Sequence, residues 1–259
     1  MSDLLQVILL GIIEGITEFL PISSTGHLLI AEKLGLGARS DVFNVVIQAG
    51  AILAVTLIYW RRLWELTTGF GKAENRDYAL KLGVSFAITA ALGLVVTKLG
   101  FKLPTELGPV AWALVIGGVW MIAAEWLAAK RPETARISWT VAIVVGIAQI
   151  VAGIFPGTSR SAATIFVAML VGGTNRVAAT EFAFLVGIPT MYAASVLLLH
   201  KALKAGAPPQ NWTDLGIAFA VSTIVAFVAV KWLLRYIQTH RFTVFAAYRI
   251  ALGAALLLA

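Results

Sequence analysis

The stretch E-G-I-T-E-F-L-P-I-S-S-T-G-H at residues 14–27 interrupts an apolar N-terminal segment with two carboxylates, a proline and a cluster of hydroxyl groups. A second polar stretch, P-G-T-S-R-S-A-A-T at 156–164, interrupts another apolar segment and carries its only basic residue, Arg160. A charged side chain at membrane depth costs about 2.5–3.5 kcal/mol on insertion scales, so such residues need a partner or a function. We predict that the two polar stretches meet in the folded protein.

The composition is typical of a polytopic membrane protein. Of the 259 residues, 59% are apolar and 13% are charged, whereas soluble domains have about 45–50% and about 25%. The chain has no cysteine, which excludes disulfides and thiolate metal sites. The formal charge of +7 resides in short loops between apolar runs, so we expect a lipid bilayer rather than a nucleic acid as the partner. Asp3 replaces the basic start of a signal peptide, and we expect no cleavable signal.

Eight apolar segments define the expected fold. Six are long enough to span a bilayer and lie near 43–60, 83–101, 109–129, 181–200, 213–237 and 242–259. The other two, 4–34 and 137–171, are broken near the middle by proline and hydroxyl groups. Broken backbone at membrane depth is tolerated only inside protein or beside a water-filled cavity. We therefore predict an all-α polytopic membrane protein with six transmembrane helices and two re-entrant helical hairpins.

Charge asymmetry predicts the orientation of these segments. The loops after 60 and around 130–137, 172–180 and 231–241 carry twelve Lys and Arg residues, against six around 32–42, 98–107 and 201–212. The positive-inside rule places the first set in the cytoplasm and both termini outside. The first hairpin then enters from the outside and the second from the cytoplasm.

An internal repeat agrees with this arrangement. A shift of 135 residues aligns Gly11 with Gly146, Glu14 with Gln149 and Pro21 with Pro156, and it places Ser24 on Ser159. Two hairpins of opposite orientation form the inverted-topology repeat that places a binding site near the midplane. We predict one integral membrane domain over 1–259, built from inverted repeats at about 4–130 and 137–259.

Two carboxylates begin the candidate site. Glu14 and Glu18 are four residues apart, so a helix presents both on one face. In a low dielectric such a pair requires a divalent cation, a shared proton or a cation such as Arg160. Paired carboxylates suit Mg²⁺ or Ca²⁺, especially when phosphate oxygens complete the coordination shell. A surface pair on an amphipathic helix is the alternative, although the flanking apolar residues leave little polar face.

The hydroxyl cluster follows the carboxylates directly. Ser23, Ser24 and Thr25 precede a second half-helix, whose N-terminus is a natural anion site. Ser24 and His27 are three residues apart, close enough for the imidazole to act as base toward the hydroxyl or to protonate a leaving oxygen. A capping serine beside a structural histidine is the common alternative. We favour Ser24 as nucleophile because it aligns with Ser159, and Ser23 is the second candidate.

Arg160 makes the second polar stretch an anion site as well. Its planar guanidinium matches a phosphate with two parallel hydrogen bonds and stays charged in apolar surroundings. The alternative is that Arg160 only neutralises Glu14 or Glu18. Arg249 lies within the last apolar run, where it can contact a phosphate indirectly or extend toward the membrane surface.

Together these motifs resemble the undecaprenyl pyrophosphate phosphatases of bacteria, the bacitracin-resistance family. Glu14 and Glu18 match the family's E-x-x-x-E motif, residues 23–27 match S-S-T-G-H, and residues 156–164 match P-G-x-S-R-S-x-x-T. Similar stretches occur along nearly the whole chain, including Phe43 to Gln48 and Tyr248-Arg249. One departure is Ala162, where the family pattern has glycine.

The resemblance implies a membrane enzyme that removes the terminal phosphate of undecaprenyl diphosphate and so recycles the lipid carrier of peptidoglycan synthesis. It also implies a divalent-cation requirement, location in the bacterial inner membrane, and an active site reached from the periplasmic face. The expected catalytic residues are Glu14, Glu18, Ser24, His27 and Arg160, the expected metal ligands are Glu14 and Glu18, and the expected phosphate-binding residues are Ser23, Thr25, Gly157, Ser159, Ser161, Thr164 and Arg249.

Two questions stay open at this level. Inverted repeats and broken helices are also features of secondary transporters, so a transporter or flippase for a lipid phosphate is the alternative function. A transporter has no need of a nucleophile beside a histidine, which favours the enzyme. A homodimer is compatible with the sequence but is not indicated by any motif.

Overall fold

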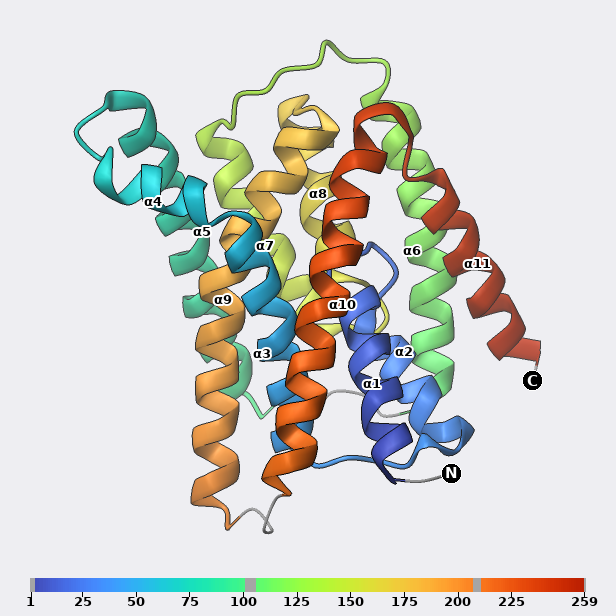
Figure 1. Ribbon diagram of the computed structural model, residues 1–259. Coiled ribbons are helices and arrows are strands. Elements are labelled where there is room, and N and C mark those ends of the chain that lie inside the picture. Colours follow the sequence, from blue (N-terminus) through green and yellow to red (C-terminus); the bar gives the residue numbers. More distant parts are fainter. Residues whose placement is uncertain (1–2, 101–105, 207–210, 259) are drawn as a thin grey trace.

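The computed structural model describes residues 3–100, 106–206 and 211–258, and these residues form eleven α-helices and one short π-helical segment (Figure 1). The elements are α1 (Asp3–Thr17), α2 (Ser24–Ala31), η1 (Glu32–Leu36), α3 (Asp41–Ile58), α4 (Trp60–Thr68), α5 (Ala73–Lys98), α6 (Leu107–Ala128), α7 (Trp139–Ile154), α8 (Arg160–Gly172), α9 (Arg176–Lys204), α10 (Trp212–Thr239) and α11 (Thr243–Leu258). The prediction of an all-α chain is confirmed.

Five helices, α3, α5, α6, α9 and α10, are long and apolar enough to cross a membrane. The expected multi-pass membrane protein is therefore confirmed at this level. The sixth expected span, 242–259, appears as α11, whose 16 residues cover about 24 Å at a rise of about 1.5 Å per residue. That is less than the hydrocarbon core of about 30 Å. The predicted span ends at 101 and 259 lie outside the described residues.

The two broken segments fold as helix–turn–helix pairs. The first consists of α1 and α2 and the second of α7 and α8, and the two pairs point in opposite directions along the bundle (Figure 1). In both, the residue before the second helix is a serine with positive φ, 76° at Ser23 and 68° at Ser159. Each serine side chain accepts a hydrogen bond from the backbone three residues on, at Gly26 and Ala162. Both turns thus end in the same N-cap.

Local sequence explains where each first half-helix ends. Pro21 and Pro156 supply no backbone N–H and cannot continue a helix. Gly157 adopts φ 94°, and a Cβ there would lie 2.9 Å from the Val110 carbonyl oxygen and 2.9 Å from the Ala113 Cβ. Glycine is thus required at this position both by the backbone angle and by the close approach of α6.

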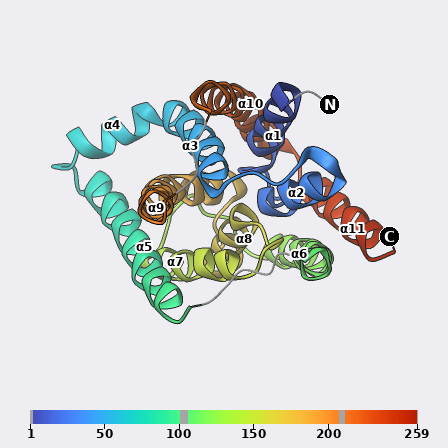
Figure 2. The same cartoon turned by 90° about the horizontal axis from the view of Figure 1, so that it is seen from below.

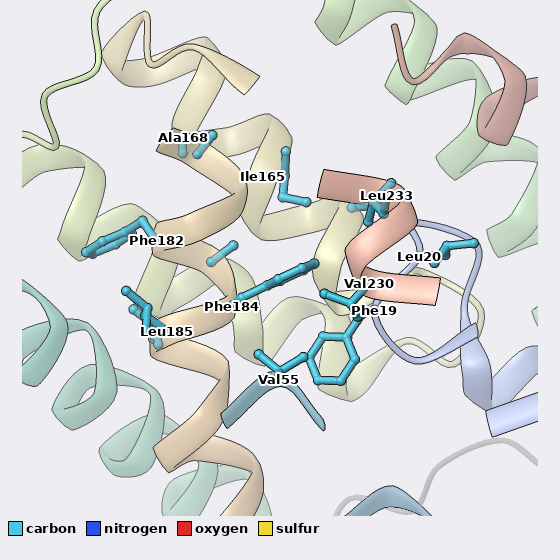
Figure 3. Close-up of a cluster of buried hydrophobic side chains, with 14 of the residues drawn as sticks. Phe19, Leu20, Val55, Ile165, Ala168, Phe182, Phe184, Leu185, Val230 and Leu233 are labelled. Carbon is cyan, nitrogen blue, oxygen red and sulfur yellow. The ribbon is translucent and has the colours of Figure 1, made fainter. Parts of the chain in front are cut away.

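Apolar side chains of the first turn anchor it in the core. Phe19 and Leu20 belong to the main buried cluster, and the Phe19 ring meets Phe184 of α9 edge-on at a centroid distance of 5.1 Å. Figure 3 shows Phe19 and Phe184 side by side, with Val55 of α3 and Val230 of α10 around them. This packing fixes the position of the polar residues that flank Phe19 and Leu20.

The halves of the chain interlock around α9. Viewed along the bundle, α9 stands between α3 and α5 with α8 beside it (Figure 2). α1 packs on α10, where a Cβ at Gly11 would lie 3.0 Å from the Ala218 carbonyl oxygen. α7 packs on α5 in the same manner, and a Cβ at Gly146 would lie 2.6 Å from the Ser85 carbonyl oxygen. Small residues at such contacts let membrane helices approach closely.

Candidate active site

The two hairpin turns meet at a polar cavity of about 260 Å³, which we call the tip cavity. The predicted meeting of the two polar stretches is therefore confirmed. The lining combines both turns with side chains from the long helices: Glu18, Ser23, Ser24, Thr25, Gln48, Thr89, Gln149, Ile150, Ala152, Gly153, Pro156, Gly157, Ser159, Arg160, Thr190 and Ala194.

Glu18 is the central contact of the cavity. One carboxylate oxygen, Oε1, forms an ion pair with Arg160 of the second hairpin. The other, Oε2, accepts a hydrogen bond from the Ser24 hydroxyl. The Glu18 side chain is 3% exposed, whereas that of Arg160 is 27% exposed. The carboxylate is thus fixed between a hydroxyl of its own turn and the guanidinium of the other.

His27 does not contact Ser24, so the pairing suggested by their spacing is not formed. Its Nδ1 lies 2.7 Å from the Ser23 carbonyl oxygen, and its Nε2 lies 2.7 Å from the Tyr248 hydroxyl. A carbonyl can only accept, so Nδ1 carries a proton and Nε2 of a neutral ring accepts from tyrosine. The group that accepts from Ser24 is Glu18.

Three of the expected phosphate ligands use their donors elsewhere. Ser161 donates to the Leu20 carbonyl at 3.1 Å and links the two turns. Thr164 donates within α8, to the carbonyls of Arg160 and Ser161. Neither residue lines the tip cavity. Ser23, Thr25, Gly157 and Ser159 do line it, and these expected ligands keep access to a bound molecule.

Arg249 is the third, and its predicted phosphate contact is wrong. The side chain is completely buried, and its guanidinium donates only to backbone carbonyls among the described residues. These acceptors belong to both turns, at Pro21, Gly157 and Thr158, and to α6. A buried cation that carbonyls surround is stabilised without a counter-ion. Arg249 therefore holds the turns in place and does not face the cavity.

The serine alignment also needs correction. A shift of 135 residues places Ser24 on Ser159, but the equivalent caps are Ser23 and Ser159, which are 136 residues apart. The second turn has one residue more between proline and cap. Ser24 is distinguished instead by its hydrogen bond to Glu18.

Glu14 lies beside a second cavity of about 440 Å³, which we call the side cavity. It is 2% exposed, and its Oε2 has no hydrogen-bond partner among the described residues. The side cavity also contains the side chains of Asn44 and Gln48, and it shares Ser24, Thr25, Gln48 and Pro156 with the tip cavity. No cluster of three or more His, Asp or Glu able to hold a metal occurs in the described part of the chain.

Sequence reasoning missed several polar residues of the two cavities. Asn44 and Gln48 are polar positions four apart inside an apolar span, which is a signal for function in membrane helices. Gln149 aligns with Glu14 across the repeat, and that alignment could have identified it. Thr89 and Thr190 resemble ordinary helix-packing threonines, and no sequence signal distinguishes them.

Comparison with known proteins places this geometry in a family. The family model described as bacitracin resistance protein BacA matches residues 7–255. A relative from Rhizobium etli named undecaprenyl-diphosphatase is 69% identical over 256 residues, covering 98% of this chain and 96% of the relative. One of the same name from Xanthomonas euvesicatoria is 63% identical over 259 residues, covering 100% of this chain and 97% of the relative. The chain therefore belongs to the bacitracin resistance protein BacA family.

Proposed function

We propose that this protein is a membrane phosphatase that hydrolyses undecaprenyl diphosphate to undecaprenyl phosphate and inorganic phosphate. The observation that carries the proposal is the contact of Glu18 with both Ser24 and Arg160, which joins a nucleophile, a base and a phosphate-binding cation in one cavity. The name undecaprenyl-diphosphatase of its relatives gives the substrate. A transporter or flippase is not favoured, because nothing in those names points to transport.

In this proposal Glu18 takes the proton of the Ser24 hydroxyl, to which it is already hydrogen-bonded. Arg160 turns from the carboxylate to the phosphoryl oxygens when the diphosphate enters, and it stabilises the charge that develops on them. Ser23, Thr25, Gly157 and Ser159 complete the phosphate contacts from the two turns. The prenyl chain stays in the bilayer.

His27 acts on the turn in this scheme. Its Nδ1 proton holds the Ser23 carbonyl, and thereby fixes the residue that precedes the nucleophile. Tyr248 of α11 orients the ring through Nε2. Protonation of the leaving oxygen by His27 requires the ring to leave Tyr248, and it stays the second role that we assign to this residue.

The donor set fits a divalent cation. The unpartnered Glu14 Oε2 and the amide oxygens of Asn44 and Gln48 are hard ligands beside the tip cavity, and Mg²⁺ sites of phosphoryl-transfer enzymes often combine one or two carboxylates with substrate phosphates. Glu18 fits less well, since Arg160 and Ser24 occupy its two oxygens. Glu14 would then hold Mg²⁺ or Ca²⁺. Such an ion supplies charge neutralisation at the phosphate oxygens.

The topology that accompanies this function is an inverted repeat of six spans and two re-entrant hairpins in one domain over 1–259. The matching caps at Ser23 and Ser159 and the opposite directions of the hairpins support it. With the basic loops in the cytoplasm, the first hairpin opens toward the periplasmic face of the inner membrane. A homodimer of this chain is a further element of the proposal, and no contact supports it.

The experiment is phosphate release from undecaprenyl diphosphate by purified detergent-solubilised protein, with and without chelator. We expect release that chelation abolishes and that Glu18→Gln does not support. Arg39→Lys is a control far from the cavity, because this side chain pairs with Asp3 at the N-terminal end. Absence of release by folded wild-type protein, combined with movement of a lipid phosphate across proteoliposomes, would establish the transporter instead.

A further inference from the structure

Uncharged polar side chains form the remainder of the tip cavity. Gln48 of α3, Thr89 of α5, Gln149 of α7 and Thr190 of α9 each come from a different helix. Thr190 donates to the Val186 carbonyl of its own helix and is satisfied there. Gln149 differs, because it is 3% exposed and its Oε1 has no hydrogen-bond partner among the described residues.

The hydrogen bonds of Thr89 fix which end of the Gln149 amide is free. The Thr89 hydroxyl has one proton, and the carbonyls of Ser85 and Gly146 both lie 2.9 Å from it. Since that proton is used there, Thr89 can only accept from Gln149, whose Nε2 lies 2.9 Å away. The amide nitrogen therefore faces Thr89, and the oxygen is left as an acceptor.

A buried acceptor in this cavity selects a ligand that donates. Ionised phosphate oxygens only accept, so Gln149 Oε1 does not bind them. Water donates two protons and suits a buried polar site with an unsatisfied group. Hydrolysis consumes one water molecule, whether water attacks the diphosphate directly or attacks a phosphoserine on Ser24.

We propose that Gln149 Oε1 positions the water that attacks phosphorus, and this inference rests on the proposed phosphatase function. One water proton points to Gln149 and the other to the Glu18 carboxylate. As the water oxygen bonds to phosphorus, the second proton passes to Glu18, and the bond from phosphorus to the leaving oxygen breaks. The leaving oxygen belongs to undecaprenyl phosphate or to Ser24, and it departs with the bonding electron pair. Gln149 keeps its proton contact throughout and orients the lone pair of the water.

Methanol as a competing acceptor tests this directly. Methanol has one hydroxyl proton, which goes to Glu18, so its attack does not use Gln149. In Gln149→Leu we expect hydrolysis to fall about a hundredfold while formation of methyl phosphate changes less than about threefold. The KM for undecaprenyl diphosphate should stay the same, because phosphate does not contact Gln149.

Matched variants separate this role from packing. Thr223 donates to the carbonyls of Phe219 and Gly50 as Thr89 donates to those of Ser85 and Gly146, but it lies outside the tip cavity. Thr223→Val should leave the ratio of hydrolysis to methanolysis unchanged. Thr89→Val, which frees the amide to turn over, should lower the ratio by less than Gln149→Leu does.

The outcomes distinguish this inference from the proposed function. An equal fall of both rates in Gln149→Leu, an unchanged hydrolysis rate, or an altered requirement for Mg²⁺ would overturn the role of Gln149 in orienting water. Methanolysis by the same sample also reports the folded fraction. If wild-type protein releases no phosphate, the phosphatase proposal itself fails.

Discussion

The two hairpin turns share a backbone and differ in chemistry. Both end in a serine cap with positive φ, at Ser23 and Ser159. The residue after the cap is Ser24 in the first turn, where it donates to Glu18, and Arg160 in the second, where it pairs with the same carboxylate. One turn thus supplies the base and the nucleophile, and the other supplies the cation. Neither turn forms a site alone, so the site depends on the contact between them.

The turns also differ in how they are held. The first is anchored by the apolar side chains Phe19 and Leu20, which are buried in the core (Figure 3). The second has no comparable anchor and depends on Gly157 against α6 and on the hydrogen bonds from Arg249. Apolar burial fixes the turn that carries the nucleophile, whereas hydrogen bonds fix the turn that carries the cation.

Removal of the cation should produce the largest effect. Arg160→Ala should lower kcat/KM by about a thousandfold or more, since cationic clamps act mainly on the transition state. Arg160→Lys should recover only part of this loss, because an ammonium cannot make two parallel hydrogen bonds. The measurement is phosphate release under steady-state conditions. Near-wild-type activity of Arg160→Lys would contradict the planar contact with phosphate.

The two adjacent serines should differ sharply. Ser24→Ala should reduce kcat about a thousandfold, because the group bonded to Glu18 is lost. Ser23→Ala removes the cap and should cost about 1 kcal/mol of stability with a much smaller change in kcat. Phosphate release and thermal unfolding in detergent measure the two effects. The reverse ranking in kcat would make Ser23 the nucleophile.

His27 provides the next test of the first turn. His27→Ala should lower kcat about a hundredfold, because the Ser23 carbonyl loses its donor and Ser24 shifts. The side-chain amide of His27→Gln can still donate to that carbonyl and should restore part of the rate. If glutamine restores nothing and the pH dependence of kcat loses one limb, the imidazole transfers protons itself.

Arg249 tests the support of the second turn. Arg249→Met leaves several buried carbonyls without a donor, so we expect a loss of about 3 kcal/mol or more of stability. The KM should change less than about twofold, because phosphate does not touch this side chain. Thermal unfolding and steady-state kinetics check both statements. A large rise of KM in a stably folded variant would return Arg249 to the phosphate-binding set.

These contrasts indicate what the sequence could predict. The positions of the apolar helices and of both breaks followed from hydropathy and proline, and the meeting of the polar stretches followed from the cost of isolated charges. Helix ends were less accurate: α5 starts at Ala73 rather than 83, because charged residues continue the helix beyond the apolar run. The pairing of His27 and the burial of Arg249 depend on α11 contacts, which local spacing does not encode.

The smallest expected effect concerns the strained caps. At Ser159, φ is 68°, a region that costs other residues about 1–3 kcal/mol and glycine almost nothing. Ser159→Ala keeps this strain and loses the cap, so it should destabilise the protein by about 1 kcal/mol. Ser159→Gly also loses the cap but relieves the strain, so it should be neutral or stabilising.

Ser138, the N-cap of α7, provides the control for this prediction because its φ of −83° is unstrained. There, glycine should be only slightly better than alanine, by about half a kcal/mol. The difference between the glycine and alanine variants, measured by thermal unfolding in detergent, should therefore be larger at Ser159 than at Ser138. Equal differences at the two positions would mean that the turn relaxes without strain. In that case the shared backbone of the two hairpins would stabilise the caps at no cost, and the sequence at these positions would be constrained by chemistry alone.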